Sequence, residues 1–134
     1  MIYIHIPFCK SRCLYCDFFS STSSELKDDF VRALLKEIEG RAEELRLARA
    51  NTIYIGGGTP SQMDTKHLTD IFDAVQRVTP LQSDAEVTIE CNPDDVTPEF
   101  VASLKSMPVN RISMGVQTFD DGLLRLLRRR HTSV

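Results

Sequence analysis

The sequence predicts an α/β fold in which parallel strands and outer helices form the first four βα units of a β/α barrel. Short segments rich in β-branched and aromatic residues alternate four times with segments whose apolar residues recur every three or four positions. Such alternation is typical of parallel βαβ units. Each predicted strand also precedes cysteine, glycine or polar residues, and parallel β/α folds bind ligands at that end of their strands.

The first unit is predicted to contain a strand, a loop and one long helix. Isoleucine alternates with more polar residues over 1–6, as in a half-buried strand. Residues 7–20 form a loop with three cysteines. The sequence Thr-Ser-Ser-Glu at 22–25 fits a capping box at a helix start. Apolar residues then recur on one stripe from Leu26 to Leu45, which predicts a single helix.

The second and third units are predicted to begin with strands at 52–55 and 86–91. The first of these strands ends at the sequence Gly-Gly-Gly-Thr-Pro, residues 56–60. Asp64 is then placed to cap a helix that Pro80 stops. The second strand alternates valine and isoleucine with threonine and glutamate, so its two faces differ in polarity.

The last part of the chain repeats the pattern. Thr97 followed by Pro98 predicts a helix start, with a hydroxyl cap and a proline in the first turn. Residues 111–116 are predicted as the fourth strand. Asp120 and Asp121 open a fourth helix, and the arginines at its far end suit the helix dipole.

Composition excludes several classes of protein. The chain has 134 residues, which suits one domain, and a net charge of −3, which implies no broad basic surface for nucleic acid. No apolar run is long enough to span a membrane, and the N-terminus lacks the basic start of a secretory signal. Free cysteines without a signal predict a cytoplasmic protein. The chain stops at 128–134 without a terminal element, which we interpret as the end of a fragment.

Three cysteines, Cys9, Cys13 and Cys16, have the spacing C-x3-C-x2-C. An odd number of thiols cannot all pair as disulfides, whereas one short loop can turn all three sulfurs toward a metal or an iron–sulfur cluster. Three ligands are one fewer than the usual four. The pattern therefore predicts a metal centre with one position open to a substrate or cofactor.

A structural zinc site is the alternative, with His5 or Cys91 as the fourth ligand. Structural zinc usually uses two separated cysteine pairs, whereas this motif is one compact triplet. Cys91 is better explained as a small buried apolar residue.

The segment from Tyr3 to Phe18, Y-x-H-x-P-F-C-x3-C-x-Y-C-D-F, resembles the radical S-adenosylmethionine (SAM) superfamily. Its context is similar to the branch that contains oxygen-independent coproporphyrinogen III oxidase and the haem chaperone. The resemblance implies that the three cysteines hold a [4Fe–4S] cluster whose fourth iron is chelated by SAM, which is then reductively cleaved. It covers nearly all of the chain and implies that residues 1–134 are the N-terminal part of a radical SAM core domain.

The same resemblance implies which residues bind the cofactors. The family's GGGTP element, a strand-end glutamate, a glutamine and an arginine contact SAM, and two tyrosines line the cluster and SAM. The matching positions are Tyr3, Tyr15, Gly57, Gly58, Thr59, Glu90, Gln117 and Arg129. A bulky residue at Gly58 is expected to weaken SAM binding without removing the cluster.

Ordinary explanations exist for several of these residues. The glycines also fit a tight turn, Glu90 a surface carboxylate, and Asn92, a weaker candidate, an Asn-Pro turn. His5 is as consistent with a hydrogen-bonding role as with a functional one, and His67 is expected on the surface. A solvated helix end explains the remaining cations of the basic run: Arg125, Arg128 and Arg130.

Phe18 distinguishes the two members of the branch. The oxidase pattern has an additional cysteine at this position, so phenylalanine favours the haem chaperone, which binds haem and passes it to respiratory enzymes. The haem-binding region of such chaperones lies downstream, so no haem ligand is assigned here. The second hypothesis is a coproporphyrinogen oxidase, and the third is a zinc-stabilised structural module.

Four βα units do not close a barrel, so we expect the 134-residue piece to self-associate. The fourth strand would expose an unpaired edge. Four apolar residues of the last two helices would also lose their packing partners, namely Phe100, Leu104, Leu124 and Leu127.

Overall fold

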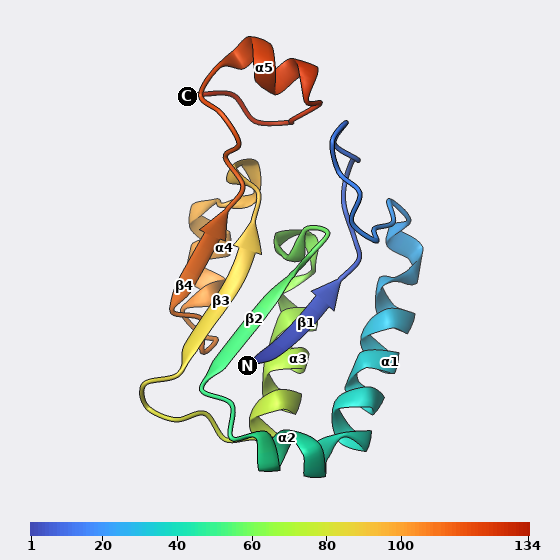
Figure 1. Cartoon of the computed structure of the whole chain (residues 1–134), viewed down its shortest axis with the longest axis vertical. Coiled ribbons are helices and arrows are strands. Elements are labelled where there is room, and N and C mark those ends of the chain that lie inside the picture. Colours follow the sequence, from blue (N-terminus) through green and yellow to red (C-terminus); the bar gives the residue numbers. More distant parts are fainter.

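A computed structural model describes the whole chain, residues 1–134. Its centre is one parallel sheet of four strands in the order β1-β2-β3-β4, as Figure 1 shows. The strands are β1 (Ile2–Ile6), β2 (Thr52–Gly57), β3 (Glu86–Cys91) and β4 (Arg111–Met114). The predicted α/β class with four parallel strands is confirmed, and both edges of this open sheet, β1 and β4, are unpaired.

Three helices contribute to one core on a single face of the sheet: α1 (Lys27–Gly40), α3 (Thr65–Val78) and α4 (Pro98–Leu104). The short helix α2 (Ala42–Ala48) leads from α1 to β2. The last helix, α5 (Asp121–Leu126), is placed differently. It lies beyond the carboxyl ends of the strands, at the same end of the molecule as the cysteine loop (Figure 1). There the Leu14 N–H donates to the Leu127 carbonyl at 3.2 Å.

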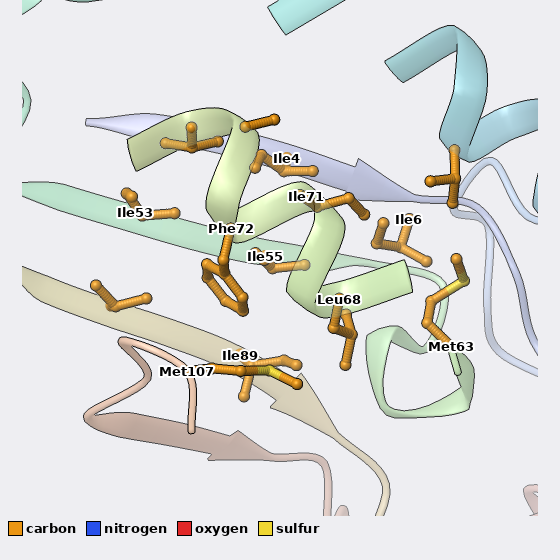
Figure 2. Packing of buried hydrophobic residues seen from close by; sticks show 14 of the residues in the cluster. Ile4, Ile6, Ile53, Ile55, Met63, Leu68, Ile71, Phe72, Ile89 and Met107 are labelled. Carbon is orange, nitrogen blue, oxygen red and sulfur yellow. The ribbon is translucent and has the colours of Figure 1, made fainter. Parts of the chain in front are cut away.

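The core forms because isoleucine and valine alternate along the first three strands. Parallel pairing places Ile4 beside Ile55 and Ile55 beside Ile89, so these side chains share one face. Figure 2 shows them packed against Leu68, Ile71 and Phe72 of α3. Full burial of each such side chain contributes about 1.5–3 kcal/mol to folding.

The helical segment between β1 and β2 differs from the single helix that was predicted. The chain enters it through a 3₁₀ turn, Ser24–Leu26, whose start has no side-chain cap, so the predicted capping box is wrong. The single helix expected up to Leu45 is interrupted at Arg41, whose φ of −101° and ψ of 14° are not helical. Gly40 precedes the break, and glycine has a low helix propensity.

Other boundaries agree more closely. The Thr97 hydroxyl accepts from the Phe100 N–H at 3.2 Å, and the Asp120 carboxylate accepts from the Leu123 N–H at 2.8 Å, so both predicted caps are confirmed. Asp64 occupies the cap position of α3 but its side chain makes no capping bond. The fourth strand ends at Met114, two residues earlier than predicted.

The apolar faces expected to lack partners are partly covered. Leu104 belongs to the core and Leu124 is buried, so that part of the prediction is wrong. On the edge strand, Ile112 and Met114 stay 38% and 43% exposed. None of the helices combines the length and the apolar character that crossing a membrane requires.

Candidate functional site

The loops that follow all four strands line one cavity of about 220 Å³ at the carboxyl ends of the sheet. Ten of the eleven predicted site residues line it: Cys9, Cys13, Tyr15, Cys16, Gly57, Gly58, Thr59, Glu90, Gln117 and Arg129. The sheet brings them together because parallel strands present their carboxyl ends on one side. Tyr3 is the exception, because it lies near the amino end of β1.

The three cysteines of the loop are half-buried free thiols. The Thr59 hydroxyl donates to Cys9 Sγ at 3.5 Å, and Arg129 Nη1 donates to Cys13 Sγ at 3.4 Å. A turn in which the Cys16 N–H donates to the Cys13 carbonyl, at 3.2 Å, brings the third cysteine back to the cavity. Groups from the loop after β2 and from the end of the chain thus already contact two of the three sulfurs.

The thiols are not grouped as a single zinc ion would require. One tetrahedral zinc holds its sulfurs roughly 3.8 Å apart, given its bond length of about 2.3 Å. No three cysteine, histidine, aspartate or glutamate side chains are grouped closely enough for a single metal ion. In a [4Fe–4S] cluster each cysteine binds a different iron, so the thiolates lie farther apart.

His5 anchors the cysteine loop. Its Nε2 lies 2.9 Å from the Phe19 carbonyl oxygen, and its Nδ1 lies 3.2 Å from the Tyr3 hydroxyl. A carbonyl only accepts, so Nε2 carries the proton and Nδ1 accepts from Tyr3. Both ring nitrogens are occupied, and the structure therefore favours the hydrogen-bonding role for His5.

The glycine segment packs directly on the start of the cysteine loop. The Gly58 N–H donates to the Ile6 carbonyl and the Thr59 N–H to the Phe8 carbonyl, both at 2.7 Å. These bonds extend the pairing of β1 with β2 past the ends of the strands. A Cβ on Gly58 would lie 2.8 Å from the Phe8 carbonyl oxygen and 3.0 Å from Cys9 Sγ.

Gly58 is therefore a structural neighbour of a cysteine as well as a cavity residue. A bulky residue here would press on the Phe8 carbonyl and on Cys9, which argues against the expectation that it would leave a metal centre undisturbed. Gly57 is required for another reason. Its φ of 110° favours glycine, and a Cβ would meet the His5 ring at 2.7 Å.

Glu90 is half-buried at the end of β3 and lines the cavity, so it is not an ordinary surface carboxylate. The Tyr54 hydroxyl donates to Oε1 at 2.6 Å, and the Gly57 N–H donates to Oε2 at 3.1 Å. The hydrogen bond to Glu90, together with burial, raises the pKa of Tyr54. Sequence reasoning missed Tyr54, although alternation along β2 places it on the cavity side.

Arg129 crosses the cavity and joins three segments. Its Nη2 donates to the Gly115 carbonyl and, at 2.8 Å, to the Asn92 side-chain oxygen, while Nη1 faces Cys13. Its Nε is buried without a hydrogen-bond partner. A buried donor left unpaired costs about 1–3 kcal/mol, so this N–H is a weak point in an otherwise well-bonded side chain. Nearby, Gln117 has a φ of 68°, which is uncommon outside glycine.

Arg130 is not the solvated helix end that the basic run suggested. Its side chain is only 22% exposed and pairs with Asp94 at 2.9 Å and Asp95 at 3.1 Å. Asp95 also accepts from the Ser61 hydroxyl at 2.8 Å. Arg125 and Arg128 are exposed, as expected, although Arg128 also borders the cavity. Arg130 and Asp94 of this network also line the cavity. Sequence reasoning missed the network because its members are far apart in sequence.

Two aromatic predictions and one histidine prediction have different outcomes. Tyr15 lines the cavity, and burial raises its pKa. Tyr3 does not line it: its ring stacks on Tyr54 with centroids 6.1 Å apart. His67 was expected on the surface, but its side chain is 14% exposed and lies 2.9 Å from Asp28 of α1. The reason is that α1 packs against α3 at this point.

Comparison with known proteins gives consistent results. The Radical SAM superfamily model matches residues 3–133. Proteins named heme chaperone HemW are similar over nearly the whole chain: 41% identical in Bacillus subtilis (96% of this chain, 35% of the relative), 39% in Escherichia coli (97% and 35%) and 38% in Mycobacterium tuberculosis (98% and 35%). The chain thus spans about a third of the length of these relatives.

A solved structure is also similar. It is that of Escherichia coli coproporphyrinogen III oxidase (HemN), described as a radical SAM enzyme, with a TM-score of 0.86 and 29% identity. The alignment covers 97% of this chain and 30% of that one. Because the family model covers almost every residue and a solved radical SAM enzyme has the same fold over 97% of the chain, this chain belongs to the radical SAM superfamily.

Proposed function

We propose that Cys9, Cys13 and Cys16 hold one [4Fe–4S] cluster and that SAM binds beside it, across the ends of β2, β3 and β4. One observation carries this proposal. Three half-buried thiols from one loop share a cavity with residues from all three other strand ends.

The side chains of the cavity have complementary tasks in this proposal. Glu90, held by two donors, has free lone pairs for the ammonium or hydroxyl groups of SAM. Arg129 brings a positive charge to the cavity wall, which suits a carboxylate. Gln117 can donate and accept, and the backbone around Gly57 and Thr59 is bare enough for close approach. Tyr3 would act indirectly, because its ring stacks on Tyr54, which donates to Glu90.

When bound, the cofactors would supply the chemistry, which is the one-electron reductive cleavage of the SAM sulfonium to methionine and a 5′-deoxyadenosyl radical. The residues of this chain would orient SAM and limit water around it.

For the whole protein we propose a cytoplasmic haem chaperone that passes haem to a respiratory protein, with no role for nucleic acid. The similarity to proteins named heme chaperone supports this choice. So does Phe18, which borders the cavity where the oxidase pattern has a cysteine. An oxygen-independent coproporphyrinogen III oxidase is the second candidate, favoured by the likeness to that enzyme's structure. Haem would bind outside residues 1–134.

Two assays on the full-length protein test the proposal. After anaerobic reconstitution, iron and sulfide analysis should give about four of each per chain, and near-stoichiometric zinc without sulfide would overturn the cluster. Haem binding without conversion of coproporphyrinogen, with SAM and a reductant supplied, is the expected second result. Robust conversion would replace the chaperone with the oxidase.

A further inference from the structure

Glu90 is held in place by one donor on each of its oxygens. Tyr54 comes from β2 and Glu90 from β3, and the pairing of Tyr54 with Thr88 and of Ile55 with Ile89 puts both side chains on the cavity side of the sheet. The Tyr54 hydroxyl lies 2.6 Å from Oε1, and the Gly57 N–H lies 3.1 Å from Oε2. Two donors on two oxygens fix both the position and the plane of the carboxylate.

The residues next to the Tyr54–Glu90 pair leave room for it and support it. A Cβ on Gly56 would lie 2.8 Å from the Tyr54 ring and 2.9 Å from Glu90 Oε2. Any other residue at position 56 would therefore push the tyrosine and the glutamate apart. The Tyr54 ring is also supported by Tyr3, with the two ring planes 25° apart.

We propose that Tyr54 is a positioning residue for Glu90 and that Gly56 is glycine to make room for the two. The inference rests on the proposed SAM site. Glu90 lines the cavity, whereas neither Tyr54 nor Gly56 does, so both act on a ligand only through the carboxylate. Gly56 is also the glycine of the triple run to which no SAM contact was assigned. Its role is to leave the space in which β2 and β3 hold the Glu90 carboxylate at the edge of the cavity.

The expected consequence concerns the affinity for SAM. Without the hydroxyl, Oε1 loses its donor and the carboxylate rotates away from its bound orientation. The net worth of one such hydrogen bond corresponds to a weakening of about 3- to 10-fold in the Kd for SAM. Iron content should not change, because neither residue contacts a cysteine.

The test uses the reconstituted full-length protein and measures SAM binding by calorimetry or equilibrium dialysis. Tyr54→Phe keeps the ring and its stacking and removes only the hydroxyl. Thr88→Val is the matched control: it removes a hydroxyl from the paired position on the same face, and that hydroxyl contacts Glu86 instead. We expect Tyr54→Phe to raise the Kd for SAM and Thr88→Val to leave it within twofold of wild type.

A double-mutant cycle separates positioning from a general structural role. In a Glu90→Gln background, Tyr54→Phe should cause no further loss, because its effect passes through the carboxylate. An unchanged Kd in Tyr54→Phe, or an equal loss in both backgrounds, would overturn the inference while leaving the SAM site itself intact. Wild-type protein that binds its cluster but no SAM would overturn the proposed function, and this inference with it.

Discussion

The two faces of the sheet are stabilised in different ways. On the helix side, Ile4, Ile55 and Ile89 are buried among apolar neighbours, and their contacts have no fixed direction. On the cavity side, Tyr54 and Glu90 meet through a short hydrogen bond. Apolar burial sets where the strands lie, and directional bonds on the other face then set where a carboxylate and a loop lie. Changes on the two faces should therefore separate stability from binding.

The largest expected effect is on iron content. Cys13→Ala should remove nearly all of the iron bound after reconstitution, because the loop supplies only three thiolates and the proposed cluster needs all of them. Cys91→Ser is the control, since Cys91 lies at the end of β3 and burial raises its pKa to about 12, which keeps the thiol protonated at neutral pH. Iron analysis checks both, and a large loss in Cys91→Ser would show that the ligands are misassigned.

On the helix side, Phe72→Ala should lower the free energy of unfolding by about 3–5 kcal/mol. Phe72 is 1% exposed and lies between α3 and the sheet, so its removal leaves a cavity. Urea denaturation of the full-length protein is the measurement. A loss below about 1 kcal/mol would mean that the core collapses around the gap.

A pair of glycine variants compares a position at the cavity, Gly58, with one at the end of α1, Gly40. Gly58→Ala should reduce iron content and SAM binding together, because the new Cβ would meet Cys9. Gly40→Ala has nothing within 4 Å and should raise stability by about 0.5–1 kcal/mol through helix propensity. If Gly58→Ala lost SAM binding but kept its full iron content, the predicted effect of Gly58 on Cys9 would be wrong.

The smallest expected effect concerns the open edge. The isolated 134-residue chain should associate through β4, where Ile112 and Met114 are partly exposed. Ile112→Lys should shift the association to higher concentration by severalfold, as judged by sedimentation at several concentrations. A wild-type chain that stays monomeric throughout would show that the edge does not drive association.

The strands, the cysteine loop and most of the cavity could be predicted because their signals are local. Alternation gave β3 its bounds, and the position of each loop after a strand placed ten predicted residues in one cavity. The break at Arg41 was missed because the apolar stripe continues across it. The contacts of Tyr54 and Arg130 depend on strand pairing and on how the last segment folds back, which no local pattern encodes.

The bonds from Gly58 to Ile6 and from Thr59 to Phe8 have a consequence for protein engineering. Residues 1–21 look like a portable cluster-binding peptide, since all three proposed ligands lie within eight positions. In the fold, the segment that precedes Cys9 is held in place by a loop fifty residues away. A transplant of the peptide alone would leave those carbonyls without partners, so the smallest unit to move to a new scaffold includes residues 52–60 as a neighbouring strand.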